Sequence, residues 1–166
     1  MMNPFSNQSL QNVKLENLVV MRGKLIVDAG PAVDRIHLIR DDHQPNRALR
    51  FIKGYIFQTS EDGVNLDNAI ACKLTTVETA AASFDASDYN QIAWMSSGAS
   101  APSTQLSQKE FVDIVDPSNI ISHDLFAEFW MESGLIQTEV NYLFIFQSVD
   151  LDDTEALVVT LDNYMS

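Results

Sequence analysis

The sequence has one cysteine, few glycines and no long apolar run, and each shortage excludes a class of protein. Cys72 stands alone, so no disulfide can form within the chain, and we expect it to be a small buried hydrophobe. Apolar runs such as residues 143–146 and 156–159 are far shorter than the roughly 20 residues of a transmembrane helix. The first 18 residues are polar, so we expect no signal peptide and no secretion by that route.

Cations are scarce in the second part of the chain. Nine of the ten Lys and Arg residues lie between Lys14 and Lys73, and only Lys109 follows, against fifteen acidic residues. Nine cations against eight acids give +1 for residues 1–73, and one against fifteen gives −14 for residues 74–166, which together make −13. Because summed charge governs solubility and long-range attraction rather than fold, this split concerns surfaces and partners.

The cations include one dense group, although the pI near 4.3 argues against a dedicated nucleic-acid-binding protein. Five cations are candidates to face a polyanion, with a solvated strand edge as the alternative: Arg35, Arg40, Arg47, Arg50 and Lys53. We expect a weak nucleic-acid contact at most.

No constellation in the sequence points to catalysis or to a cofactor. The six glycines are isolated, and neither a phosphate-binding loop nor a Gly-x-Ser-x-Gly elbow occurs. The Asp-Asp-His turn at residues 41–43 and the acidic run at residues 150–155 lack the pattern of zinc and calcium sites. We therefore expect a protein that is not an enzyme and has no metal or cofactor.

Alternation of apolar and polar residues predicts strands along most of the chain. Residues 124–133 fit either a strand or a helical stripe, and we favour the strand. The eight predicted strands are residues 13–27 (with a bulge or bend at Gly23), 34–40, 47–59, 69–79, 90–96, 109–115, 124–133 and 140–149. One short helix is expected at residues 154–164, capped by Asp152 or Asp153.

Eight short strands separated by turn signals predict an all-β fold, because no connection is long and amphipathic enough for a parallel α/β architecture. We predict an eight-stranded jelly roll, or else another Greek-key sandwich, with the short C-terminal helix. The sandwich is expected to be a single domain at residues 13–166, preceded by a flexible arm at residues 1–12.

The strand at residues 140–149 is apolar on both sides, which predicts a contact between subunits. One side carries aromatic residues and the other carries Leu143 and Ile145, so the strand needs its own core and a second cover. The candidate interface residues are Tyr142, Phe144, Phe146 and Trp130.

The C-terminal third combines strands, a turn and a helix in a pattern that resembles a known family. The pattern comprises Val115-Asp116-Pro117-Ser118-Asn119-Ile120-Ile121, Asp124-Leu125-Phe126, Asn141-Tyr142-Leu143-Phe144-Ile145 and Asp152-Asp153-Thr154-Glu155-Ala156-Leu157. Over this third, the chain resembles the single jelly-roll capsid proteins of small icosahedral viruses, notably those inferred from uncultured single-stranded DNA viruses. The resemblance implies an eight-stranded subunit without catalytic residues that assembles with its own copies into a closed shell around a genome. The implied location is the virion, assembled in the host cytoplasm, with other virion proteins as further candidate partners.

The N-terminus departs from that family. Many of its members begin with a disordered arm rich in Arg and Lys, whereas residues 1–12 contain no basic residue. A packaged genome would then be screened by another protein, a lipid layer, counterions or the cations of residues 35–53. The alternative function is a lectin-like or receptor-binding spike module that uses loops 80–89 and 98–108, with Asp88, Tyr89 and Trp94 as candidate sugar contacts.

Overall fold

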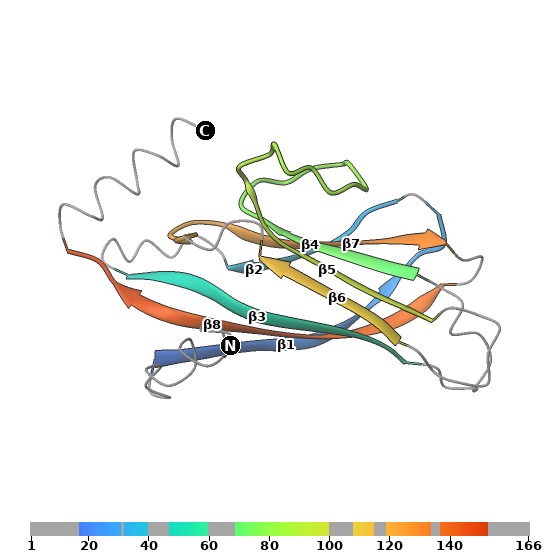
Figure 1. The fold of residues 1–166 in the computed structure, drawn as a ribbon, viewed down its shortest axis with the longest axis horizontal. Helices are drawn as coiled ribbons and strands as arrows, with labels where there is room; N and C mark the ends of the chain where they lie inside the picture. Colours follow the sequence, from blue (N-terminus) through green and yellow to red (C-terminus); the bar gives the residue numbers. More distant parts are fainter. Residues whose placement is uncertain are drawn as a thin grey trace, which may run out of the picture.

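The computed structural model describes residues 17–30, 32–39, 47–59, 69–99, 108–114, 119–133 and 137–152. These residues form strands in two antiparallel sheets that pack as a β sandwich, so the predicted all-β class is confirmed (Figure 1). The strands are β1 (Leu18–Val27), β2 (Asp34–Ile39), β3 (Arg47–Thr59), β4 (Ala69–Thr75), β5 (Gln91–Ala99), β6 (Gln108–Ile114), β7 (Leu125–Ser133) and β8 (Thr138–Asp150). Within the described ranges, no helix has the length and apolar character to cross a membrane.

The strand order brings together strands that are far apart in the sequence. Sheet A has the order β1-β8-β3, and sheet B has the order β2-β7-β4-β5-β6. The first strand therefore pairs with the last and the second with the seventh, both antiparallel. Such pairs join distant parts of the sequence, so the fold depends mainly on contacts far apart along the chain.

The core lies between the two sheets and is lined by alternate residues of each strand. On β8, Val140, Phe144 and Phe146 point inward and are fully buried. Across from them, sheet B contributes buried side chains such as Leu74 and Phe129. Because burying each large apolar side chain stabilises the fold by about 1.5–3 kcal/mol, this layer is the main source of stability.

A β-bulge in β3 changes which residues of that strand face the core. Phe51 pairs with Phe146 and Lys53 pairs with Ile145, so Ile52 is an extra residue in the ladder. Before the bulge Phe51 points inward, and after it the buried residue is Ile56, while Phe57 is exposed. Strict alternation along residues 47–59 would place Phe51 and Phe57 on one face of the strand, and this expectation from the sequence is wrong because the bulge reverses the phase.

The predicted alternative of a bulge at Gly23 is wrong, because β1 pairs with β8 without a register shift. A Cβ atom at Gly23 would collide with the ring of Tyr142, so the glycine makes room for that side chain. The strand assignment at 124–133 is confirmed, whereas residues 76–79 of the predicted fourth strand belong to a loop. The predicted arm at residues 1–12, the helix at 154–164 and most of loop 98–108 lie outside the described residues.

Candidate functional site

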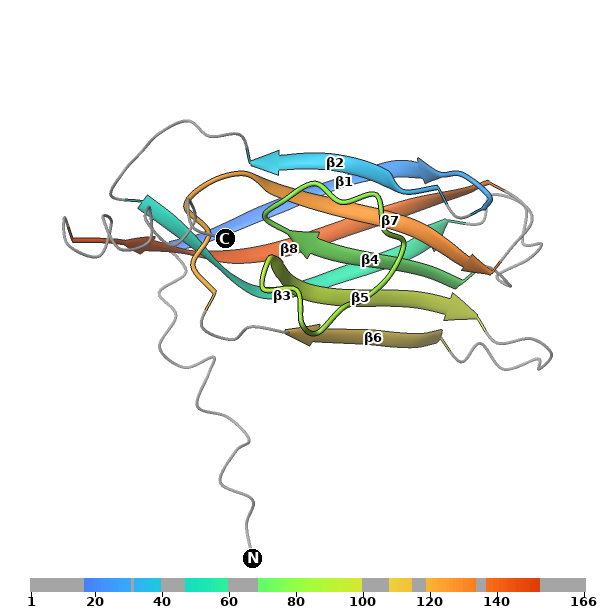
Figure 2. The ribbon, with the colours of Figure 1, turned by 90° about the horizontal axis from the view of Figure 1, so that it is seen from above.

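The outer face of sheet B lies under the chain's own loop. Loop 76–90, which joins β4 to β5, folds back over the sheet (Figure 2). We call the covered surface the B face; it is formed by Lys73 on β4, Trp94 on β5 and Glu128 and Trp130 on β7. Lys73 and Glu128 are completely buried there, although both residue types are charged at neutral pH.

Glu128 is the centre of a buried polar cluster. One carboxylate oxygen accepts hydrogen bonds from the Thr79 backbone N–H at 2.8 Å and from Arg35 Nε at 2.9 Å. The other accepts a bond from the Thr79 hydroxyl at 2.7 Å and lies 3.4 Å from Lys73 Nζ. Arg35 also binds the Thr79 carbonyl at 2.6 Å and Glu78 at 3.0 Å. This carboxylate of β7 therefore connects β2 and β4 to the start of the loop.

Lys73 connects the same cluster to the middle of the loop. Its ammonium donates hydrogen bonds to the carbonyls of Ala81 at 2.8 Å and Ser83 at 3.3 Å. It also lies 5.7 Å from the centre of the Trp130 ring, which adds a cation–π contact. The charged groups of Lys73 and Glu128 bond each other and the loop, and removing either partner would leave the other as a costly buried ion.

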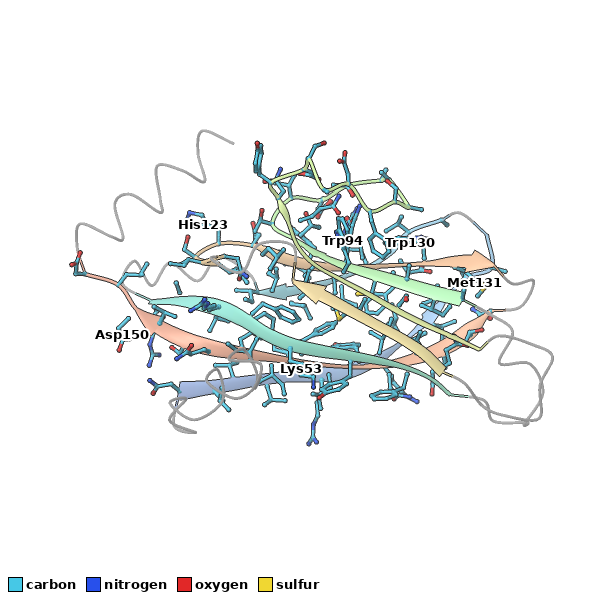
Figure 3. All side chains as sticks on the ribbon, in the orientation of Figure 1. Lys53, Trp94, His123, Trp130, Met131 and Asp150 are labelled. Carbon is cyan, nitrogen blue, oxygen red and sulfur yellow. The ribbon has the colours of Figure 1, made fainter. Side chains whose placement is uncertain are left out.

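An aromatic group completes the cover over sheet B. Phe84 from the loop stacks on Trp94 with ring centres 5.1 Å apart and meets Trp130 edge-on at 5.0 Å. Figure 3 labels both tryptophans between the sheet and the loop. The indole N–H of Trp94 donates to Gln91 Oε1 at 2.7 Å. The candidate sugar contact Trp94 is therefore engaged within the chain.

The tip of the loop is acidic and carries one exposed aromatic residue. Tyr89 is 94% exposed, the highest value among the described large hydrophobic residues. Asp88 beside it accepts hydrogen bonds from Asn90 and Gln91, which fixes the backbone of the tip. Hydrogen bonds from the Ser87 hydroxyl and backbone N–H lower the pKa of Asp85, which stays ionised at neutral pH. The tip is exposed, so a ligand could reach it.

The outer face of sheet A has a different chemistry. We call this surface the A face; apart from Glu139, its main charged and apolar residues are Val20, Arg22, Lys24, Ile26, Arg50, Lys53, Tyr55, Phe57, Leu143 and Ile145. Val20 and Ile26 are each 53% exposed and Phe57 is 40% exposed. The four cations make this face positive although the chain carries −13 overall.

Contacts on the A face keep its aromatic and cationic side chains in place. Lys53, which Figure 3 labels, lies 4.7 Å above the centre of the Tyr55 ring, and Tyr55 stacks on Phe57. Lys24 makes an exposed ion pair with Glu139 at 2.9 Å. A shallow hollow on this face is lined by Arg22, Gly23, Lys24, Phe57, Asn141, Tyr142 and Leu143. The A face thus combines a depression, exposed apolar surface and positive charge.

The aromatic residues predicted as an interface lie inside the subunit. Phe144 and Phe146 belong to the core between the sheets, and Trp130 is buried under loop 76–90. Tyr142 is half-buried on the same inward side, packed between Phe129 and Phe144, and burial raises its pKa. Tyr142, Phe144 and Phe146 are therefore corrected to residues of the inward side of β8, because the two apolar sides of that strand were assigned to core and neighbour in the wrong order. Trp130 is corrected to a residue of the B face that the chain's own loop covers. The side left for a neighbour carries Leu143 and Ile145.

The predicted polyanion-facing residues do not converge on one surface. Arg35 is held in the Glu128 cluster on sheet B, and Arg40 lies outside the described residues. Arg50 and Lys53 lie on the A face, whereas Arg47, three residues before Arg50, lies on the other side of β3. The A-face cations Arg22 and Lys24 were missed because they are isolated on another strand.

Two further groups add no chemistry to the site. Cys72 is fully buried, and burial raises the pKa of its thiol well above the ordinary value, which fits the predicted small hydrophobe. His37 pairs with Asp124 at 2.6 Å and stacks on Phe126. No group of three or more potential metal ligands occurs in the described part of the chain. The buried pair of Lys73 and Glu128 on the B face could have been suspected from the sequence, because both are charged residues inside otherwise apolar strands.

The chain was compared with protein-family models, curated proteins and solved structures, and none of them matches it significantly.

Proposed function

We propose that the chain is a jelly-roll coat subunit that assembles with its own copies into a closed shell. The observation that carries this proposal is the strand pairing. A jelly roll is a long antiparallel ribbon wrapped into two sheets, in which the first strand pairs with the last and later pairs nest inside. The pairs β1·β8, β2·β7 and β4·β5 follow that scheme. The fourth nested pair would be β3·β6, and β6 pairs with β5 instead.

Exposed apolar surface supports self-assembly. Val20, Ile26 and Phe57 are large apolar residues exposed on the A face, and exposed apolar surface is a feature of interaction sites. The opposite face of the sandwich is already covered by loop 76–90, so the A face and the edges are the surfaces that neighbours would meet. Subunits of charge −13 repel one another at long range, which makes short-range apolar contact the expected cohesive force.

Particle size tests this function directly. Purified full-length protein is measured by light scattering and imaged by negative-stain microscopy in low salt and in about 1 M salt, where charges are screened beyond about 3 Å. Closed particles of uniform size that persist or increase in high salt are expected. A protein that remains monomeric at all concentrations, or particles that dissolve completely in high salt, would contradict a shell held by apolar contacts.

A second candidate function is a binding module that uses the tip of loop 76–90. The specific observation in its favour is Tyr89, which is almost fully exposed on a loop anchored by buried ion pairs. A rigid loop that presents an aromatic ring beside a carboxylate suits a carbohydrate or a receptor surface. Two results together would favour this function over the shell. Light scattering would show trimers or monomers, and the protein would bind a glycan array through a contact that Tyr89→Ser abolishes.

A further inference from the structure

We propose that the tip of loop 76–90 of one copy docks into the hollow on the A face of a second copy, a head-to-tail contact that rests on the proposed self-assembly. Charge favours this pairing. Loop 76–90 contains three acids and no cation, whereas Arg22 and Lys24 line the hollow. The tip and the hollow therefore attract each other and fix one orientation, although whole subunits repel. Two A faces placed against each other would instead bring cations together.

The tip and the hollow also match in their apolar groups. Tyr89 is 94% exposed, on a loop that the buried ions of the B face hold in place. The hollow offers Leu143 and Phe57, which is 40% exposed. A tyrosine ring in a pocket is a common anchor of protein interfaces, because it covers much apolar surface at a small cost in side-chain entropy. The Tyr89 ring would lie against Phe57, and the exposed carboxylate of Asp85 in the same tip would meet the cations.

The positions of the two surfaces require a second copy. Figure 1 shows loop 76–90, in green, on the outer side of sheet B, with sheet A on the other side of the sandwich. The hollow opens on the outer side of sheet A, so two packed sheets, about 10 Å apart, separate it from the tip. Lys73 and Glu128 tie the loop to sheet B, so the tip cannot reach the hollow of its own subunit. Because the contact joins two different surfaces, each subunit can use both at once.

Two variants, each damaged on one of the two surfaces, test the contact. Tyr89→Ser removes the ring of the tip, and the double variant Arg22→Glu, Lys24→Glu reverses the charge of the hollow. All three positions are exposed, so both variants should fold like the parent protein in circular dichroism. Self-association measured by sedimentation velocity should weaken roughly tenfold or more in each variant. An equimolar mixture has one intact contact for each pair of subunits, so mixed dimers and no larger species are expected. A mixture that stays monomeric while the parent associates would overturn the head-to-tail contact.

Matched controls separate the contact from general effects of charge and of the loop. The double variant Arg47→Glu, Arg50→Glu changes the net charge equally at positions about 20 Å or more along β3 from Phe57, beyond the Debye length of about 8 Å at physiological ionic strength. Val77→Ser removes another exposed apolar side chain of loop 76–90, away from the tip. Both controls should associate within about twofold of the parent protein. Losses equal to those of the test variants would show that net charge or loop structure governs association, and would overturn the docking.

Three further outcomes separate the docking from its rivals and from the coat function. A labelled oligothymidylate that binds a monomeric parent protein, and that the Arg22→Glu, Lys24→Glu variant releases, would make the A face a nucleic-acid site and overturn the docking. Closed particles that form equally well in Tyr89→Ser keep the coat and overturn the docking. Mixed dimers of the two variants, together with a parent protein that forms only open chains, keep the docking and reject the closed shell.

Discussion

The A face and the B face are both outer surfaces of one sandwich, yet they treat charge in different ways. On the B face, Lys73 and Glu128 are fully buried, and loop 76–90 supplies hydrogen-bond partners to both. On the A face, the side chain of Lys24 is 67% exposed in its ion pair with Glu139. A buried ion pair depends on each partner because a lone buried ion is costly, whereas an exposed pair is screened by water. The comparison teaches that the B face is internal structure and the A face is available surface.

The largest effect should come from placing a charge on each side of β8. Phe144 is fully buried in the core, and Phe144→Asp introduces an ion without a partner at a cost of several kcal/mol, comparable with the 5–15 kcal/mol stability of a typical domain. We expect no cooperative unfolding transition by circular dichroism. Leu143→Asp, one residue away on the A face, should leave the fold intact and reduce assembly measured by light scattering. If both variants fold and assemble equally well, the claim that one side of β8 faces the core and the other a neighbouring copy is wrong.

The next effect concerns the buried carboxylate of the B face. Glu128→Ala leaves Lys73 buried without its counter-ion and removes two hydrogen bonds to Thr79, so the free energy of unfolding should fall by about 3–5 kcal/mol. Urea denaturation measures the loss. Glu128→Gln keeps one acceptor oxygen, replaces the other by a donor NH2 group and removes the charge, so its stability should fall between those of the parent and the alanine variant. A loss below about 1 kcal/mol would mean that the cluster acts like a surface pair.

A smaller effect is expected when the aromatic cover is removed. Phe84 is half-buried between Trp94 and Trp130, and Phe84→Ala should cost about 1.5–3 kcal/mol, the value of burying one large side chain. The loop would lose its hold on the sheet, so tryptophan fluorescence should shift toward the red before global unfolding. Fluorescence unchanged from the parent protein would show that the ion cluster alone keeps the loop in place.

Local patterns explain how much of this comparison was predictable. The strands at 47–59, 124–133 and 140–149 follow from alternation, which acts over a few residues. The pairing of β1 with β8 leaves no local signature, because it depends on contacts across the whole chain. The inward side of β7 followed from Leu125, Ala127 and Phe129, but Glu128 on its outer side was not recognised as a buried residue.

The bulge at Ile52 is the clearest limit of the sequence pattern. Without it, Phe51, Tyr55 and Phe57 would share one side of β3 and all would be assigned to the core. The extra residue turns Tyr55 and Phe57 outward beside Lys53, which creates much of the A face. No glycine or proline marks position 52, and Gly54 nearby instead fits the close contact with Met95. The A face could therefore not be predicted from the sequence, because the side on which Tyr55 and Phe57 lie depends on the bulge.

The smallest effect should come from the exposed ion pair of the A face. Lys24→Gln breaks the contact with Glu139, and we expect the free energy of unfolding to fall by about 1 kcal/mol or less, because both partners contact water and side-chain freedom is regained when the pair is broken. That difference should shrink further in about 1 M salt, where the Debye length is about 3 Å. Urea denaturation of Lys24→Gln and Glu139→Gln at two salt concentrations measures it, and the double variant isolates the pair from each residue's other contacts. A coupling energy as large as the loss in Glu128→Ala would show that Lys24 and Glu139 are shielded from water, and the A face would then need a cover within the subunit rather than from a neighbouring copy.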